Sequence, residues 1–81
     1  MTFSAFKNLH QRRQAEHLAR HGHPLAERQE DGCELRLFAV GSYYAEVWRS
    51  RGEEAILFIH VFEKASGLND YLPLISIRDY Q

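Results

Sequence analysis

The 81-residue sequence is poor in several features that would point directly to a function. Cys33 is its only cysteine, so no disulfide can form within the chain, and a lone thiol suits a reducing cytoplasm or, less often, a bridge between two chains. Its five glycines stand singly, which excludes a glycine-rich nucleotide-binding loop. The longest apolar run, 55–62, contains His60 and is far too short to span a bilayer. The first residues contain no apolar signal segment. We therefore expect a soluble, cytoplasmic protein.

An excess of charge of either sign is also missing. The chain has 10 Lys and Arg residues against 11 Asp and Glu residues, which gives a formal net charge of -1. Nucleic-acid binders normally show a basic excess, so the balance argues against DNA or RNA as the partner. Binding through helix arginines stays open as a further alternative. The basic residues near the N-terminus spread around a predicted helix as on a solvated face: Lys7, Arg12, Arg13 and Arg20.

What the sequence does contain fits one small α+β domain over residues 1–81. Its hydrophobic content of 44% and aromatic content of 12% suit a folded chain. In a domain of this size, apolar burial exceeds the loss of chain entropy only narrowly. Oligomerisation is a usual supplement, and we expect a homodimer or a complex with a protein partner.

One helix is predicted near the N-terminus. Thr2 or Ser4 can cap its start, Gly22 can end it, and Pro24 prevents its continuation. Its apolar residues form a narrow stripe suited to lying on a sheet. They are Ala5, Ala15, Leu18 and Ala19, with Leu9 at the margin.

Three turn signals divide the following residues into strands. The turns are Asp31-Gly32 of type I′, Gly41-Ser42 of type II′, and Arg51-Gly52. The strands lie near residues 25–30, 33–40, 43–50 and 53–62, although the first segment is also compatible with a helix. We therefore expect an antiparallel three- or four-stranded meander with the N-terminal helix packed on one face. A short C-terminal helix near 68–72, or an apolar tail over 74–77, completes the prediction.

The central strands hardly alternate between apolar and polar residues, so both faces of the sheet need cover. Two-residue turns fix the register, which pairs Val40 with Tyr43 and Val47 with Ile56. The helix is expected to cover the more aliphatic face, which carries Leu35 and Leu37. A large exposed apolar patch normally marks an interaction surface, and aromatic residues are typical interface anchors. The remaining aromatic face, which we predict to be an interface, contains Phe38, Tyr43, Phe58, His60 and Phe62.

Glu46 lies in the middle of a strand between Tyr44 and Trp48. A buried carboxylate can act as a general acid or base, so these three residues define a candidate ligand pocket and the alternative of a small ligand-binding protein or enzyme. More often such a carboxylate pairs with a basic residue or a hydroxyl. We favour that structural role, and with it a non-enzymatic interaction module.

His17 and His21 have the i, i+4 spacing with which two histidines on a helix can bind one metal ion. No glutamate follows the first histidine, so the pair is not the H-E-x-x-H motif. Two ligands are common on helices, whereas three or four converging ligands define a site. The two histidines are weak candidates, and we expect no metal or cofactor.

Two resemblances bear on the layout. The segments YYAEVW (43–48), ILFI (56–59) and LNDYL (68–72) resemble a pattern of small uncharacterised bacterial proteins over about residues 9–73, which implies this layout and no particular activity. The element order also resembles the double-stranded-RNA-binding domain. That domain grips phosphates with a lysine-rich start to its last helix, whereas EKASGLND (63–70) has one lysine and two acids. The resemblance therefore implies the element order alone.

Overall fold

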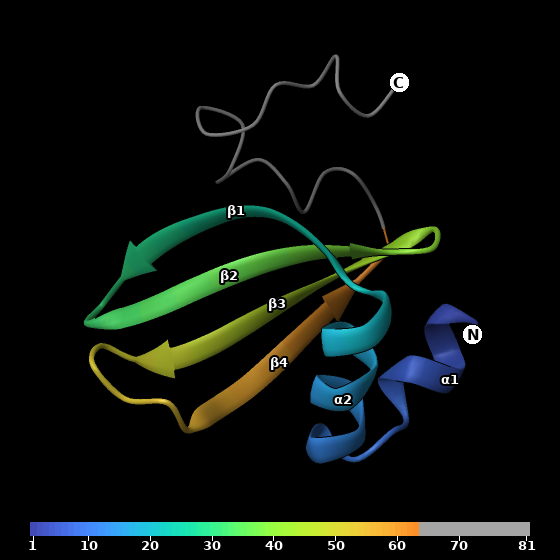
Figure 1. Ribbon diagram of the computed structural model, residues 1–81, viewed down its shortest axis with the longest axis horizontal. Helices are drawn as coiled ribbons and strands as arrows, with labels where there is room; N and C mark the ends of the chain where they lie inside the picture. The colour runs from blue at the N-terminus through green and yellow to red at the C-terminus, as the bar shows by residue number, and fades with distance from the viewer. Residues whose placement is uncertain (64–81) are drawn as a thin grey trace.

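The computed structural model describes residues 1–63 and shows an α+β fold (Figure 1). Two helices come first, and the four strands form one antiparallel sheet in chain order, so the predicted meander is confirmed, including a strand over 25–30. The predicted C-terminal helix or tail lies outside the described residues. The elements are α1 (Phe3–Lys7), α2 (Gln11–His21), β1 (His23–Glu30), β2 (Cys33–Val40), β3 (Tyr43–Ser50) and β4 (Ile56–Phe62).

The prediction of one continuous N-terminal helix is wrong. Thr2 does cap α1, because its hydroxyl accepts a hydrogen bond of 3.1 Å from the Ala5 N–H, but α1 ends at Lys7. In a straight helix Phe6 and Leu18 would point about 120° apart, since each residue advances about 100°. The break between the helices lets both side chains face the sheet, where they are 0% and 3% exposed. Gln14 of α2 fixes this arrangement by donating a hydrogen bond of 3.0 Å to the Phe6 carbonyl.

The first two hairpins follow their turn residues. Asp31 and Gly32 both have positive φ, 49° and 75°, as a type I′ turn requires. Gly41 has φ of 58°, and it precedes the predicted pairing of Val40 with Tyr43. The register between β2 and β3 is therefore confirmed.

The predicted register between β3 and β4 is wrong, because the connecting loop is longer than two residues. The Glu53 N–H donates a hydrogen bond of 3.0 Å to the Ser50 carbonyl, and β4 begins only at Ile56. Val47 consequently pairs with Ile59 instead of Ile56. A shift by an odd number of residues moves every side chain of the strand to the opposite face.

The helices cover the sheet face that was predicted to be open. Their apolar side chains pack against buried residues of β2, β3 and β4, with Phe38 partly buried at the margin. Phe38 and Tyr43 therefore lie on the helix side, whereas Phe58, His60 and Phe62 lie on the other face, so the five predicted interface residues do not share one surface. The buried residues of this core are Phe6, Leu18, Val40, Tyr43, Ala45, Val47 and Val61.

The face turned away from the helices, which we call the second face, has apolar packing of its own. Leu37 is 0% exposed and contacts Leu25, Tyr44 and Phe62. Leu35 is buried as well. Both faces of the sheet are apolar, as the weak alternation predicts, although their assignment is reversed.

Gly22, which ends α2 as predicted, is required by a close approach. Its backbone is extended (φ -74°, ψ 143°), so a left-handed conformation plays no part. A Cβ atom at this position would lie 2.5 Å from the Leu18 carbonyl oxygen and 3.1 Å from a ring carbon of Phe38. The Leu18 oxygen is backbone and cannot rotate away.

Gly22→Ala is therefore expected to lower the free energy of unfolding by about 1–3 kcal/mol, because the added methyl forces α2 away from the sheet. Urea unfolding followed by circular dichroism measures the change. His21→Ala serves as the control, since His21 is exposed and adjacent. Equal stability of the two variants would contradict the packing argument.

Candidate functional site

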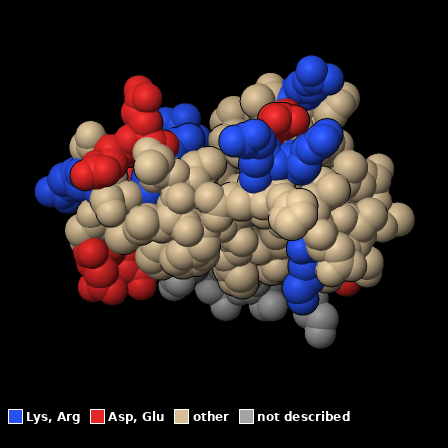
Figure 2. Space-filling model, turned by 90° about the horizontal axis from the view of Figure 1, so that it is seen from below, with Lys and Arg blue, Asp and Glu red and all other residues tan. Residues whose placement is uncertain are grey.

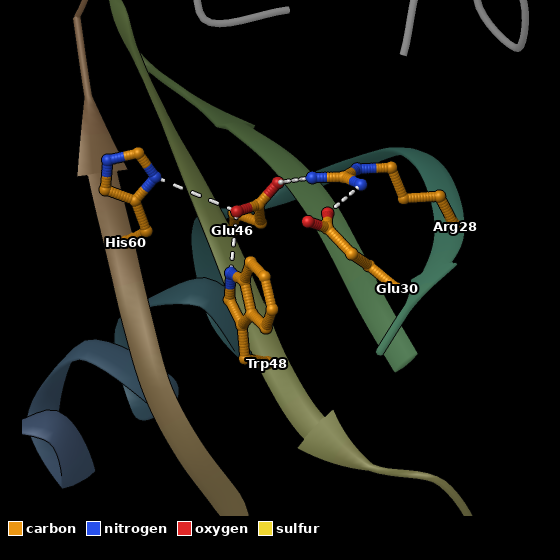
Figure 3. Close-up of polar contacts among 5 residues, drawn as sticks. All are labelled: Arg28, Glu30, Glu46, Trp48 and His60. Atoms are coloured by element: carbon orange, nitrogen blue, oxygen red, sulfur yellow. Dashed lines mark hydrogen bonds and ion pairs between the residues drawn. The ribbon is translucent and has the colours of Figure 1, made fainter. Parts of the chain in front are cut away.

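A buried carboxylate lies at the centre of the second face (Figure 3). The Glu46 side chain is 6% exposed, and its Oε1 accepts a hydrogen bond of 2.6 Å from the Trp48 indole N–H. Its Oε2 lies 3.6 Å from Nη2 of Arg28, and Oε1 lies 3.7 Å from Nδ1 of His60. Arg28 also forms an ion pair with Glu30. The carboxylate thus has polar neighbours from three strands.

Strand geometry explains how these residues meet. Glu46 and Trp48 are two positions apart on β3, so their side chains point to the same face. His60 is the direct cross-strand partner of Glu46, and Arg28 comes from β1, on the far side of β2. The interpretation that Glu46 pairs with a basic residue is confirmed. Arg28 itself was not predicted, since it lies in the segment whose strand character the sequence left open.

Stacked aromatic rings flank the carboxylate on both sides. Trp48 and Phe58 have ring centroids 4.8 Å apart and planes 22° apart, and Tyr44 and Phe62 stack at 5.4 Å and 23°. Offset stacks of this kind add stability beyond their apolar burial. The candidate pocket residues Tyr44, Glu46 and Trp48 do lie together, as predicted. Their rings and carboxylate are occupied with one another and with β4 and β1, which is the geometry of a structural cluster.

The predicted histidine pair lies side by side on α2. The ring centroids of His17 and His21 are 4.8 Å apart, and the His17 ring also packs on Phe6 at 5.6 Å. Burial lowers the pKa of His17 below its usual value, and the charge of His21 adds to the effect. Within residues 1–63, no group of three or more His, Cys, Asp or Glu side chains is placed to hold a metal ion.

Tyr43 sits under the helices with its ring 5.4 Å from that of Phe6. Its buried hydroxyl has no hydrogen-bond partner among the residues that the structure describes, and burial raises the pKa of this phenol. The side chain is 2% exposed, so Tyr43 is a core residue and not part of an interface.

Strand β4 presents an apolar edge. Leu57 is 51% and Phe58 46% exposed, and Met1 is the other large apolar side chain with comparable exposure in the described part of the chain. The sequence Ile56–Phe62 carries no Asp, Glu, Lys or Arg. Figure 2 views the molecule from the lower side of Figure 1, where β4 lies, and shows an uncharged band between charged groups toward both ends. The opposite edge strand, β1, contains a proline and several charged residues.

Comparison with protein-family models, with curated proteins and with solved structures finds no match to this chain. No helix within residues 1–63 has the length and apolar character needed to cross a membrane. Arg12, Arg13 and Arg20 are all exposed on α2.

Proposed function

We propose that this chain is a non-enzymatic protein-interaction module that binds its partner along the edge of β4. One observation supports this proposal above all: Leu57 and Phe58 are exposed on an edge strand that contains no charged residue within Ile56–Phe62. An edge strand offers a row of backbone N–H and C=O groups to any extended chain that lies beside it. Exposed apolar side chains on the same strand add contact area that such a partner can bury.

The two edges of the sheet differ in the way that this proposal requires. Proteins commonly protect edges with charged side chains, prolines or bulges that prevent unwanted pairing. β1 carries Pro24, Glu27, Arg28 and Glu30, and its register is interrupted between Pro24 and Ala26. Within Ile56–Phe62, β4 has none of the charges or prolines, and its own register with β3 shifts once, beside Trp48. The contrast supports β4 as the side that receives a partner.

The state of Glu46 supports a non-enzymatic role. Its carboxylate is bonded to the Trp48 indole, lies beside Arg28, and is almost closed to solvent. A general acid or base needs access to the proton that it transfers. The geometry is better explained by a structural role, in which polar contacts of Glu46 connect β1, β3 and β4 and stabilise the second face.

The lone thiol of Cys33 supports the cytoplasm as the place of action, and the proposed role requires no metal or cofactor. Binding of nucleic acid through α2 finds less support, because Glu16 stands among the exposed arginines and the net charge is -1. Of the five residues predicted for the interface, Phe58, His60 and Phe62 belong to β4 and are part of the proposed binding edge. Phe38 and Tyr43 lie on the helix side and are not part of it.

The proposal is tested with a photoreactive phenylalanine analogue placed at Leu57 in living cells. We expect a discrete cross-linked product at this position, whether the captured chain is a second copy or another protein. The same analogue at His23, which is exposed on the β1 edge, is the matched control. Adding Phe58→Lys to the Leu57 probe should abolish the product. Equal labelling at positions 57 and 23, or a product that survives Phe58→Lys, would contradict the proposal.

A further inference from the structure

We propose that the chain on β4 is a second copy of this protein, added antiparallel so that two four-stranded sheets become one of eight strands. The inference rests on the proposed function, since it names the occupant of the same edge. It follows from three properties of β4: its neutrality, its self-complementary backbone, and the position of its exposed side chains.

The absence of charged side chains on β4 favours a partner strand that is also uncharged. A partner strand with acidic or basic side chains would find no counter-charge within Ile56–Phe62 and would lose hydration at an apolar edge. A second β4 brings no formal charge and requires none. Two identical antiparallel strands are also related by a two-fold axis, so each N–H and C=O along the edge meets its complement.

The midpoint of β4 sets the register. All seven residues overlap only when Ile59 faces Ile59 of the partner subunit. Phe58 then lies opposite His60 of the partner subunit, on the second face of both copies. His60 already borders Glu46 at 3.7 Å, and Phe58 already stacks on Trp48 at 4.8 Å. The paired strands would join the two clusters into one continuous row.

The start of β4 limits how far the pairing extends. The Gln11 side chain of α2 donates a hydrogen bond of 3.1 Å to the Ile56 carbonyl, so this acceptor is already engaged. With Ile56 and the opposing Phe62 of the partner subunit left out, residues 57–61 still pair symmetrically about Ile59, and the exposed apolar side chains begin at Leu57. Leu57 would lie opposite Val61 of the partner subunit in this register. Dimer formation thus buries the two most exposed apolar side chains of the sheet.

Light scattering over a concentration series gives the first test. We expect twice the chain mass of 9.5 kDa at high concentration. Leu57→Lys and Phe58→Lys should each raise the dissociation constant at least about tenfold, the equivalent of about 1.4 kcal/mol. His23→Lys places the same charge on the opposite edge strand and should leave it unchanged. Circular dichroism of each variant confirms that the fold is retained.

Cysteine pairing tests the register in a Cys33→Ser background. A mixture of Phe58→Cys and His60→Cys chains should form a disulfide-linked dimer under mild oxidation, because directly opposed strand residues have suitable Cα separations. Phe58→Cys alone should not. Phe58 is 46% and the His60 side chain 59% exposed, and circular dichroism checks that each variant keeps the fold. Efficient cross-linking of Phe58→Cys with itself would overturn the register.

A monomer at every concentration up to about 1 mM would overturn the second copy as occupant. The same holds for a dimer that survives both lysine variants. In either case a product captured at Leu57 that contains a different protein would leave the proposed function intact. A monomer with no such product would overturn both.

Discussion

Phe6→Ala is expected to lower the free energy of unfolding by about 3–5 kcal/mol, enough to unfold a domain of this size at moderate temperature. Phe6 is 0% exposed although it stands in a helix of only five residues. Its ring contacts Tyr43 at 5.4 Å and His17 at 5.6 Å, so it joins α1, α2 and the sheet. Removing it leaves a cavity that neither helix can close.

Urea unfolding at several temperatures measures the loss, with Phe3→Ala as the control. Phe3 is the other phenylalanine of α1, is only partly buried, and lies 6.1 Å from the Tyr43 ring. Phe3→Ala should lower the free energy of unfolding clearly less than Phe6→Ala does. If the two variants lose the same stability, α1 is held by general apolar contact and not by the Phe6 side chain.

The importance of Phe6 could not be read from the sequence, because the sequence contains no strong signal for the break in the helix. Residues 4–21 consist of good or neutral helix formers, and a single helix satisfies their local preferences. Tertiary packing disfavours the single helix, because a straight helix would turn Phe6 away from the face that carries Leu18. The gain from burying both outweighs the few backbone hydrogen bonds lost at the break.

The sheet was predictable wherever local chemistry determines the turn. Asp31-Gly32 and Gly41-Ser42 have the conformational freedom that tight turns demand, so their hairpins follow directly. After Ser50 the same reasoning fails. Gly52 does have positive φ, 81°, but the chain continues through Ala55 before pairing resumes, and a bulge follows beside Trp48. The residue types between β3 and β4 do not indicate how long this loop is.

That one loop decides which side chains share a surface. Tyr44, Glu46 and Trp48 were correctly grouped because alternation within one strand needs no knowledge of pairing. Their neighbours on β4 and β1, His60 and Arg28, depend on register and topology. The candidate site is thus predictable within a strand and unpredictable across strands.

Glu46→Ala is expected to cost about 3 kcal/mol of unfolding free energy, because it removes the carboxylate on which the Trp48 N–H and one ion pair of Arg28 depend. Glu46→Gln keeps an acceptor for the indole and should cost less, about 1 kcal/mol. Glu27→Ala is the matched control: its ion pair with Arg36 is shorter, 2.7 Å, but both side chains are well exposed. Exposed pairs contribute little, so this change should stay below about 0.5 kcal/mol.

These three variants distinguish a structural Glu46 from a functional one. A large loss for Glu46→Ala, with Glu46→Gln intermediate, means that the carboxylate ties β1, β3 and β4 together and that the second face depends on it. Losses no greater than that of Glu27→Ala would mean that a buried carboxylate persists at no benefit to the fold. Burying a charge is costly unless the site repays it. A stable Glu46→Ala variant would therefore favour a ligand site around Tyr44 and Trp48 over binding along the β4 edge.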